Sequence, residues 1–70
     1  MKLVDEVTGQ EVKVGDKRKD FRGEEVTVKG IYAPGQPGGG GGGRVLLKYP
    51  EPDGHEFPYY PGVVKTKFVD

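Results

Sequence analysis

The single histidine of this 70-residue chain, His55, is the residue best suited to acid–base or metal chemistry. It lies among three carboxylates, Glu51, Asp53 and Glu56. An imidazole with carboxylates can bind zinc, but alternation along an extended segment sends His55 and Glu56 to opposite faces. Residues 50–54, Pro-Glu-Pro-Asp-Gly, have the composition of a tight turn. We therefore favour a solvated turn and expect no metal and no cofactor.

Residues for nucleophilic catalysis are few. The chain contains no serine, cysteine or asparagine, so hydroxyl nucleophiles reduce to Thr8, Thr27 and Thr66, none of which lies beside a base in sequence. Glu24 and Glu25 are adjacent and would face apart on a strand, which is wrong for a pair of catalytic carboxylates. We expect a protein that is not an enzyme.

Six consecutive glycines, residues 38–43, formally contain the spacing G-x-G-x-x-G of phosphate-binding loops. Such a loop needs a following helix, whose N-terminal N–H groups hold the phosphate. Here the β-favouring sequence Arg-Val-Leu-Leu follows instead. Polyglycine also has a large backbone entropy to lose on folding. We therefore expect residues 33–43 to be a flexible Pro/Gly loop, either inert or ordered by a partner.

Aromatic side chains gather in the second half of the chain. Tyr59 and Tyr60 are consecutive, so they cannot both point inward from one strand, and one of them should be exposed. An exposed tyrosine beside prolines is a suitable contact for a protein partner. We predict a partner-binding surface at the rim of the glycine loop, formed by Tyr49, Arg44, Tyr59 and Tyr60. The alternative is that such a ring only fills a shallow surface groove.

The basic residues suggest a different partner. If the strands that carry them are neighbours, Lys17, Lys19, Lys65 and Lys67 could form a stripe that contacts phosphates while tyrosines stack on bases. The same lysines also suit edge strands, where charge prevents edge-to-edge pairing. Eleven Lys and Arg balance eleven Asp and Glu, which removes the strong positive field of a dedicated nucleic-acid binder. Nucleic-acid binding is therefore the alternative to protein binding.

Short β-prone segments separated by turn residues must position these groups. The expected strands cover residues 2–7, 11–14, 17–21, 24–32, 44–49, 55–60 and 63–69. The strand at 44–49 has apolar residues on both faces, which predicts a central position in its sheet. Gly30 should mark a bulge or bend, and Pro58 should break its strand. No segment has the apolar period of an α-helix, so helix is limited to one turn near residues 60–63.

This pattern predicts an all-β fold, a small antiparallel SH3-like barrel or β-roll of five to seven short strands with at most one helical turn. Residues 1–70 form a single small domain. Because the chain has no cysteine, the core must stabilise the fold without disulfides. Alternation predicts that six side chains face inward: Val26, Val28, Leu47, Phe57, Val64 and Phe68.

We see neither a signal peptide nor an apolar run long enough to span a membrane. A soluble, cytoplasmic protein is therefore expected, and a monomer is favoured. Neither expectation identifies a partner or a biological process.

Several stretches resemble short uncharacterised proteins encoded by phages of actinobacteria. They are V-T-G-Q-E-V-K-V-G-D at residues 7–16, D-F-R-G-E at 20–24, the P-G-Q-P-G-G loop before Arg44, and Y-Y-P-G-V-V followed by K-F-V near the end. The resemblance covers nearly the whole chain. It implies a small SH3-like fold in the host cytoplasm with a host or phage protein as partner. It implies no activity, because similar proteins have none assigned.

Overall fold

The computed structural model describes residues 1–52 and 54–70. They form six short strands and one 3-10 helix: β1 (Lys2–Asp5), β2 (Lys17–Lys19), β3 (Glu25–Tyr32), β4 (Arg44–Lys48), β5 (Glu56–Tyr59), η1 (Pro61–Val64) and β6 (Thr66–Val69). These strands pair antiparallel. The expected all-β fold with one short helical turn is therefore confirmed.

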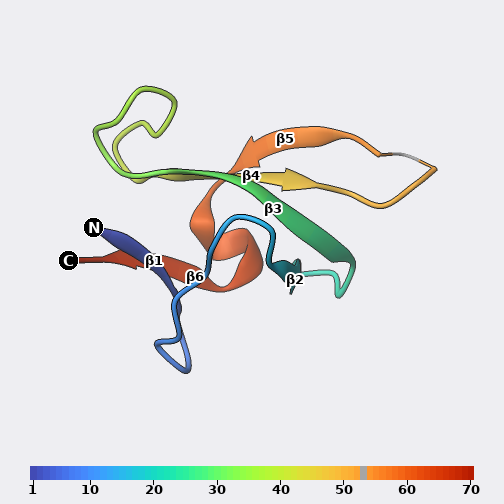
Figure 1. Ribbon diagram of the computed structural model, residues 1–70, viewed down its shortest axis with the longest axis horizontal. Coiled ribbons are helices and arrows are strands. Elements are labelled where there is room, and N and C mark those ends of the chain that lie inside the picture. Colours follow the sequence, from blue (N-terminus) through green and yellow to red (C-terminus); the bar gives the residue numbers. More distant parts are fainter. Residues whose placement is uncertain (53) are drawn as a thin grey trace.

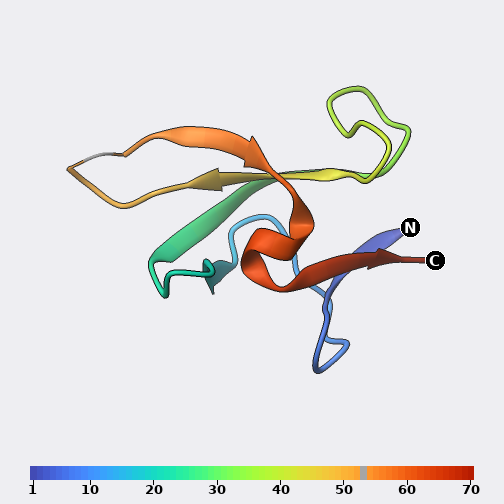
Figure 2. The same cartoon turned by 180° about the vertical axis from the view of Figure 1, so that it is seen from behind.

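The strands belong to two sheets (Figure 1). One has four strands in the order β2-β3-β4-β5, and the other pairs β1 with β6, so that Lys2 lies opposite Val69 and the two chain ends are side by side. From the front and from behind, β1, β6 and η1 lie on the same side of β4 and β5 (Figure 1, Figure 2). Among the described strands no ladder joins the two sheets. The strands therefore form two packed sheets, and the closure of these sheets into a barrel stays a prediction.

The hydrophobic core fills the space between the sheets. β4 is flanked by β3 and β5, as its apolar residues on both faces predicted. Val45 and Leu47 on its inner face are completely buried, whereas Leu46 on the other face is half-buried. The buried cluster consists of Leu3, Val12, Val26, Val28, Val45, Leu47, Tyr49 and Val64.

Two of the six residues expected inside differ from the prediction. Phe57 is 57% exposed and Phe68 is only partly buried, whereas the four aliphatic residues of that set are buried. Phe57 pairs with the buried Leu47, so it faces the core side of the sheet as alternation requires. However, β5 is an edge strand, and of its residues on this face only Tyr59 packs against the core. Alternation predicts which face a residue lies on, but not how far the other layer reaches.

The first strands are shorter than expected because side chains hold the turns. The Asp5 carboxylate accepts hydrogen bonds from the backbone N–H groups of Val7 and Thr8, both at 2.8 Å, and β1 ends at Asp5. Residues 11–14 form no strand, and Glu11 makes only an isolated bridge to Val4. β2 likewise ends at Lys19, where the turn of residues 20–24 begins.

Gly30 and Pro58 have different effects on their strands. The β3–β4 register shifts between Val28 and Gly30, which confirms the bulge. Pro58 does not break β5, and it pairs with Leu46 within the strand. The Tyr49 N–H donates to the His55 carbonyl at 2.9 Å, and hydrogen-bonded pairs alternate along an antiparallel ladder. The nitrogen of Pro58 therefore faces away from β4, where no N–H is needed.

Residues 33–43 fold back on themselves. The Gly35 N–H donates to the Gly40 carbonyl and the Gly39 N–H to the Gln36 carbonyl, both at 2.9 Å. The side-chain oxygen of Gln36 accepts a hydrogen bond from the Ala33 N–H at 3.0 Å. Motion of this loop stays a prediction, but its glycines occupy different surroundings, some open and some enclosed.

Two glycines of this loop should respond differently to substitution. A Cβ atom at Gly43 would collide with the ring of Phe68 on β6, and φ there is +82°, whereas a Cβ at Gly41 would meet no atom within 4 Å. We expect Gly43→Ala to lower the free energy of unfolding by about 1–3 kcal/mol and Gly41→Ala to change it by less than about 1 kcal/mol. Urea unfolding measures both values. Equal effects would show that the loop does not approach Phe68.

The corrected core makes a second prediction. Leu47→Ala should lower the free energy of unfolding by about 2–5 kcal/mol, because it leaves a cavity between the sheets. Phe57→Ala removes a larger but mostly exposed ring, and its effect should be below about 1 kcal/mol. The comparison uses urea unfolding followed by circular dichroism. If Phe57→Ala lowered the free energy of unfolding as much as Leu47→Ala, Phe57 would belong to the core.

Candidate partner-binding site

Tyr60 stands at the junction of β5 and η1. Its backbone is extended, with φ −64° and ψ 145°, and Pro61 begins the helix directly after it. The Tyr60 side chain is 65% exposed. The guanidinium carbon of Arg44 lies 4.1 Å from the centroid of its ring, which is a cation–π contact. Arg44 therefore supports one face of the tyrosine while most of the side chain stays in solvent.

Arg44 also holds the glycine loop. Its Nη1 donates to the Gly43 carbonyl at 2.8 Å and to the Gly39 carbonyl at 3.3 Å. One guanidinium thus contacts both the loop and the ring of Tyr60. The structure places Arg44, Tyr60 and the loop rim next to one another, which is the arrangement assumed for the predicted surface.

Tyr59 is half-buried and packs against the core. Its ring lies 5.6 Å from that of Phe57 at an angle of 66°, and its hydroxyl is 3.1 Å from Nε2 of His55. Sequence reasoning missed Phe57 as a surface residue, and its place on the last strand of the sheet is the signal that could have identified it. We call residues 57–60, Phe-Pro-Tyr-Tyr, the aromatic edge.

Tyr49 lies in the core, which corrects its predicted role as a surface contact. It is 3% exposed, and its ring stacks on the imidazole of His55 with centroids 4.5 Å apart and an angle of 15°. Its hydroxyl donates to Oδ2 of Asp20 at 2.9 Å. Burial and the carboxylate of Asp20 raise the pKa of Tyr49 to about 12. Tyr49 therefore supports the fold beside the aromatic edge and cannot offer its ring to a partner.

The buried carboxylate of Asp20 organises the turn of residues 20–24. Its Oδ1 accepts hydrogen bonds from the backbone N–H groups of Arg22 and Glu24, each at 2.9 Å. Burial alone would raise the pKa of Asp20, but the hydrogen bonds from Glu24, Tyr49 and Arg22 outweigh burial and lower it. The turn carries Phe21, which is 72% exposed and lies 5.6 Å from the Arg22 guanidinium.

The four lysines of the predicted phosphate-binding stripe fall into two groups. Lys17 and Lys19 flank Arg18 on β2, and Arg18 points inward to the backbone at the end of η1. Alternation turns Lys17 and Lys19 to the outer face of the four-stranded sheet. Lys65 caps η1, and Lys67 lies on β6 in the other sheet, exposed between two more buried neighbours. The outer faces of two packed sheets point in opposite directions, so the four lysines do not form one stripe.

His55 is not the solvated residue that the turn composition predicted. It is half-buried and packs between Tyr49 and Tyr59. Asp53, one of the carboxylates considered with it, lies outside the described residues. Elsewhere in the described chain, no group of three or more His, Asp or Glu side chains is arranged to hold a metal ion.

Because the comparisons with known proteins find no match, the function is inferred from the geometry of the site. No family model, no curated protein and no solved structure matches the chain. Within residues 1–52 and 54–70, no helix has the length and apolar composition needed to cross a membrane.

The carboxylates of Asp5 and Asp20, which accept hydrogen bonds from N–H groups of their turns, should make the free energy of unfolding depend on pH. The N–H of Thr8, the guanidinium of Arg18 and the N–H of Val7 lower the pKa of Asp5, and the pKa of Asp20 is also lowered. When the pKa of a carboxyl group is lower in the folded state than in the unfolded state, about 3.9, the ionised group stabilises the fold above the unfolded-state pKa. This stabilisation is lost as the pH falls through the folded-state pKa.

We therefore expect Asp20→Asn to be less stable than the wild type near neutral pH, and the difference to shrink below about pH 4. Urea unfolding from about pH 2 to pH 7 measures the two curves, and Asp70→Asn, at an exposed aspartate, is the control. A difference between wild type and Asp20→Asn that is the same at every pH would contradict a lowered pKa at Asp20.

Proposed function

We propose that this protein is a non-catalytic interaction module that binds another protein through its aromatic edge. One observation carries the proposal: Phe57 and Tyr60 are 57% and 65% exposed, yet each is held by a neighbour. Tyr59 lies 5.6 Å from Phe57, and Arg44 lies 4.1 Å from Tyr60. A ring that is already fixed loses little conformational entropy on binding, and aromatic residues dominate the binding energy of many interfaces.

The position of these rings supports recognition by side chains. β5 is the last strand of its sheet, so a partner can approach both of its faces. Pro58 removes one backbone donor from the open side of this strand, which disfavours pairing with a strand of the partner. The contact therefore depends on the rings and on the guanidinium of Arg44.

A protein partner accounts for these features better than a nucleic acid. The net charge is zero, and Lys17 and Lys67 lie on the outer faces of different sheets. Tyr49 is buried, so it cannot stack on a base. The resemblance to phage proteins favours a host or phage protein in the host cytoplasm as the partner.

Affinity capture from lysate of an actinobacterial host, with and without nuclease, tests the proposal. We expect the wild type to retain a protein after nuclease treatment, and Phe57→Ser with Tyr60→Ser to lose it. Phe21→Ser removes a ring that is 72% exposed and lies outside the aromatic edge, and it serves as the matched control. With the purified partner, each edge substitution should weaken binding by about tenfold or more. Loss of capture on nuclease treatment, or equal binding by the edge variants, would overturn the proposal.

A further inference from the structure

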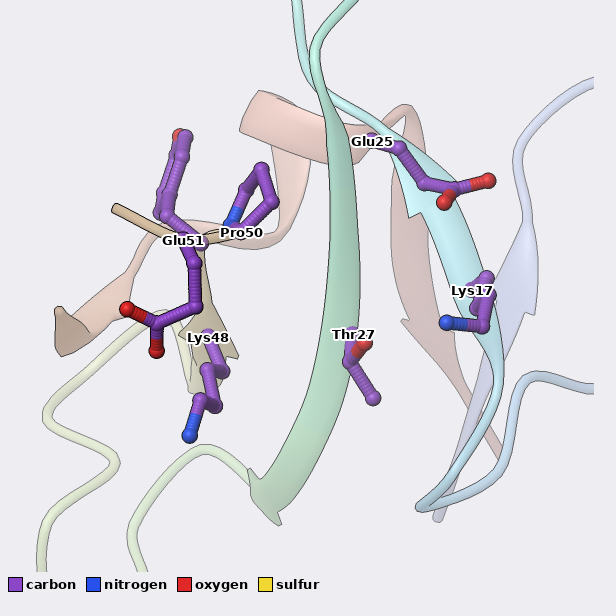
Figure 3. A pocket seen from close by; sticks show the side chains of 7 residues that line it. Lys17, Glu25, Thr27, Lys48, Pro50 and Glu51 are labelled. Carbon is purple, nitrogen blue, oxygen red and sulfur yellow. The ribbon is translucent and has the colours of Figure 1, made fainter. Parts of the chain in front are cut away.

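The outer face of the four-stranded sheet contains a hollow of about 300 Å³ (Figure 3). Its floor is formed by β2, β3 and β4, and the turn after β4 forms one wall. Of the side chains that line it, only Tyr49 takes part in the contacts described above. It is lined by Lys17, Glu25, Thr27, Lys48, Tyr49, Pro50 and Glu51.

One row of paired residues crosses the floor of the hollow. Lys17 pairs with Thr27, and Thr27 pairs with Lys48. Neighbouring strands are about 4.8 Å apart, so the two lysine backbones lie about 10 Å apart with the threonine between them. In Figure 3 the ammonium group of Lys17 is turned toward β3, and Lys48 lies on the other side of that strand. Two cations and a hydroxyl group are therefore within reach of one small anionic group.

The charges around the hollow are not used by the fold. Ion pairs among the described residues involve Arg18 and Arg22, and none involves Lys17, Lys48, Glu25 or Glu51. The lining thus has two ammonium groups and two carboxylates, which sum to zero. The positions of these charges differ, however, because Lys17 and Lys48 are the direct partners of Thr27, whereas Glu25 lies two residues along β3 and Glu51 lies in the turn after β4. An anion seated on Thr27 is therefore closer to the two ammonium groups than to the two carboxylates. A carboxylate group, with two oxygens, can face one lysine with each, whereas the additional oxygens of a phosphate would extend toward Glu25 and Glu51.

We propose that the hollow binds the carboxylate of an aspartate or glutamate side chain of the protein partner. Lys17 and Lys48 donate to the carboxylate oxygens from either side, and the hydroxyl of Thr27 donates from the floor. Glu25 and Glu51 discriminate against phosphate groups. This inference names the partner's chemistry and so rests on the proposed function, but the site can be tested without the partner.

NMR titration of the full-length chain with N-acetyl-glutamate N-methylamide is the test. We expect saturable shifts of the Thr27 and Lys48 amides, with a dissociation constant on the order of millimolar, and no response to the glutamine analogue. Lys17→Gln and Lys48→Gln should each weaken binding by about tenfold, and Thr27→Val by several fold. Lys67→Gln makes the same change in net charge on the other sheet and should leave the affinity within about twofold.

Absence of shifts, or unchanged affinity in Lys17→Gln and Lys48→Gln, would overturn the inference. The inference would also be overturned if inorganic phosphate bound more tightly than the glutamate probe and if Glu25→Gln and Glu51→Gln raised the affinity for phosphate further. That result would assign the hollow to phosphate ligands. Capture of the partner through Phe57 and Tyr60 is measured separately. If the probe binds and the edge variants still capture the partner, only the proposed function fails.

Discussion

The guanidinium of Arg18 joins the two sheets, and the rest of the arrangement depends on this connection. From β2 it donates to Oδ2 of Asp5 on β1 and to the Val64 carbonyl in η1, both at 2.8 Å. A sheet of two strands is marginal by itself, and β2 has only three residues. An inward charge on an edge strand also discourages pairing with other chains. Because Arg18 points inward, alternation requires Lys17 to point outward, into the hollow.

β4 connects the two proposed contact regions. Arg44 at its first residue supports Tyr60, and Lys48 at its last residue lines the hollow. Four steps of an extended strand separate them by about 13 Å, which a short extended segment of a partner can span. β4 itself is held rigidly, because Val45 and Leu47 are completely buried. A single partner could therefore meet both Tyr60, at the end of β5, and the charged hollow.

Local chemistry made much of the fold predictable from sequence. Alternation and turn residues predicted six of the seven expected strands, the irregularity at Gly30 and the single helical turn, because these depend on nearest neighbours. The burial of Tyr49 continues the alternation of Val45 and Leu47 along the chain, so local pattern could have indicated it. The exposure of Phe57, in contrast, depends on where one layer ends over another, which no local pattern records. The hollow was missed for a similar reason, since register across three strands brings Lys17 and Lys48 to one place. Asp20 was also missed, because a buried carboxylate looks like any turn residue in sequence.

The pairing of β1 with β6 has a consequence for how this domain can be joined to other chains. Lys2 lies opposite Val69, and paired residues in antiparallel strands are about 5 Å apart. The domain can therefore be inserted into a surface loop of another protein without forcing the ends of that loop apart. For the same reason a short linker could close the present ends, with new ends opened between Gly41 and Gly42, where a Cβ atom would meet no atom within 4 Å. Such a circular permutant would keep the paired strands together while cutting only the open part of the glycine loop.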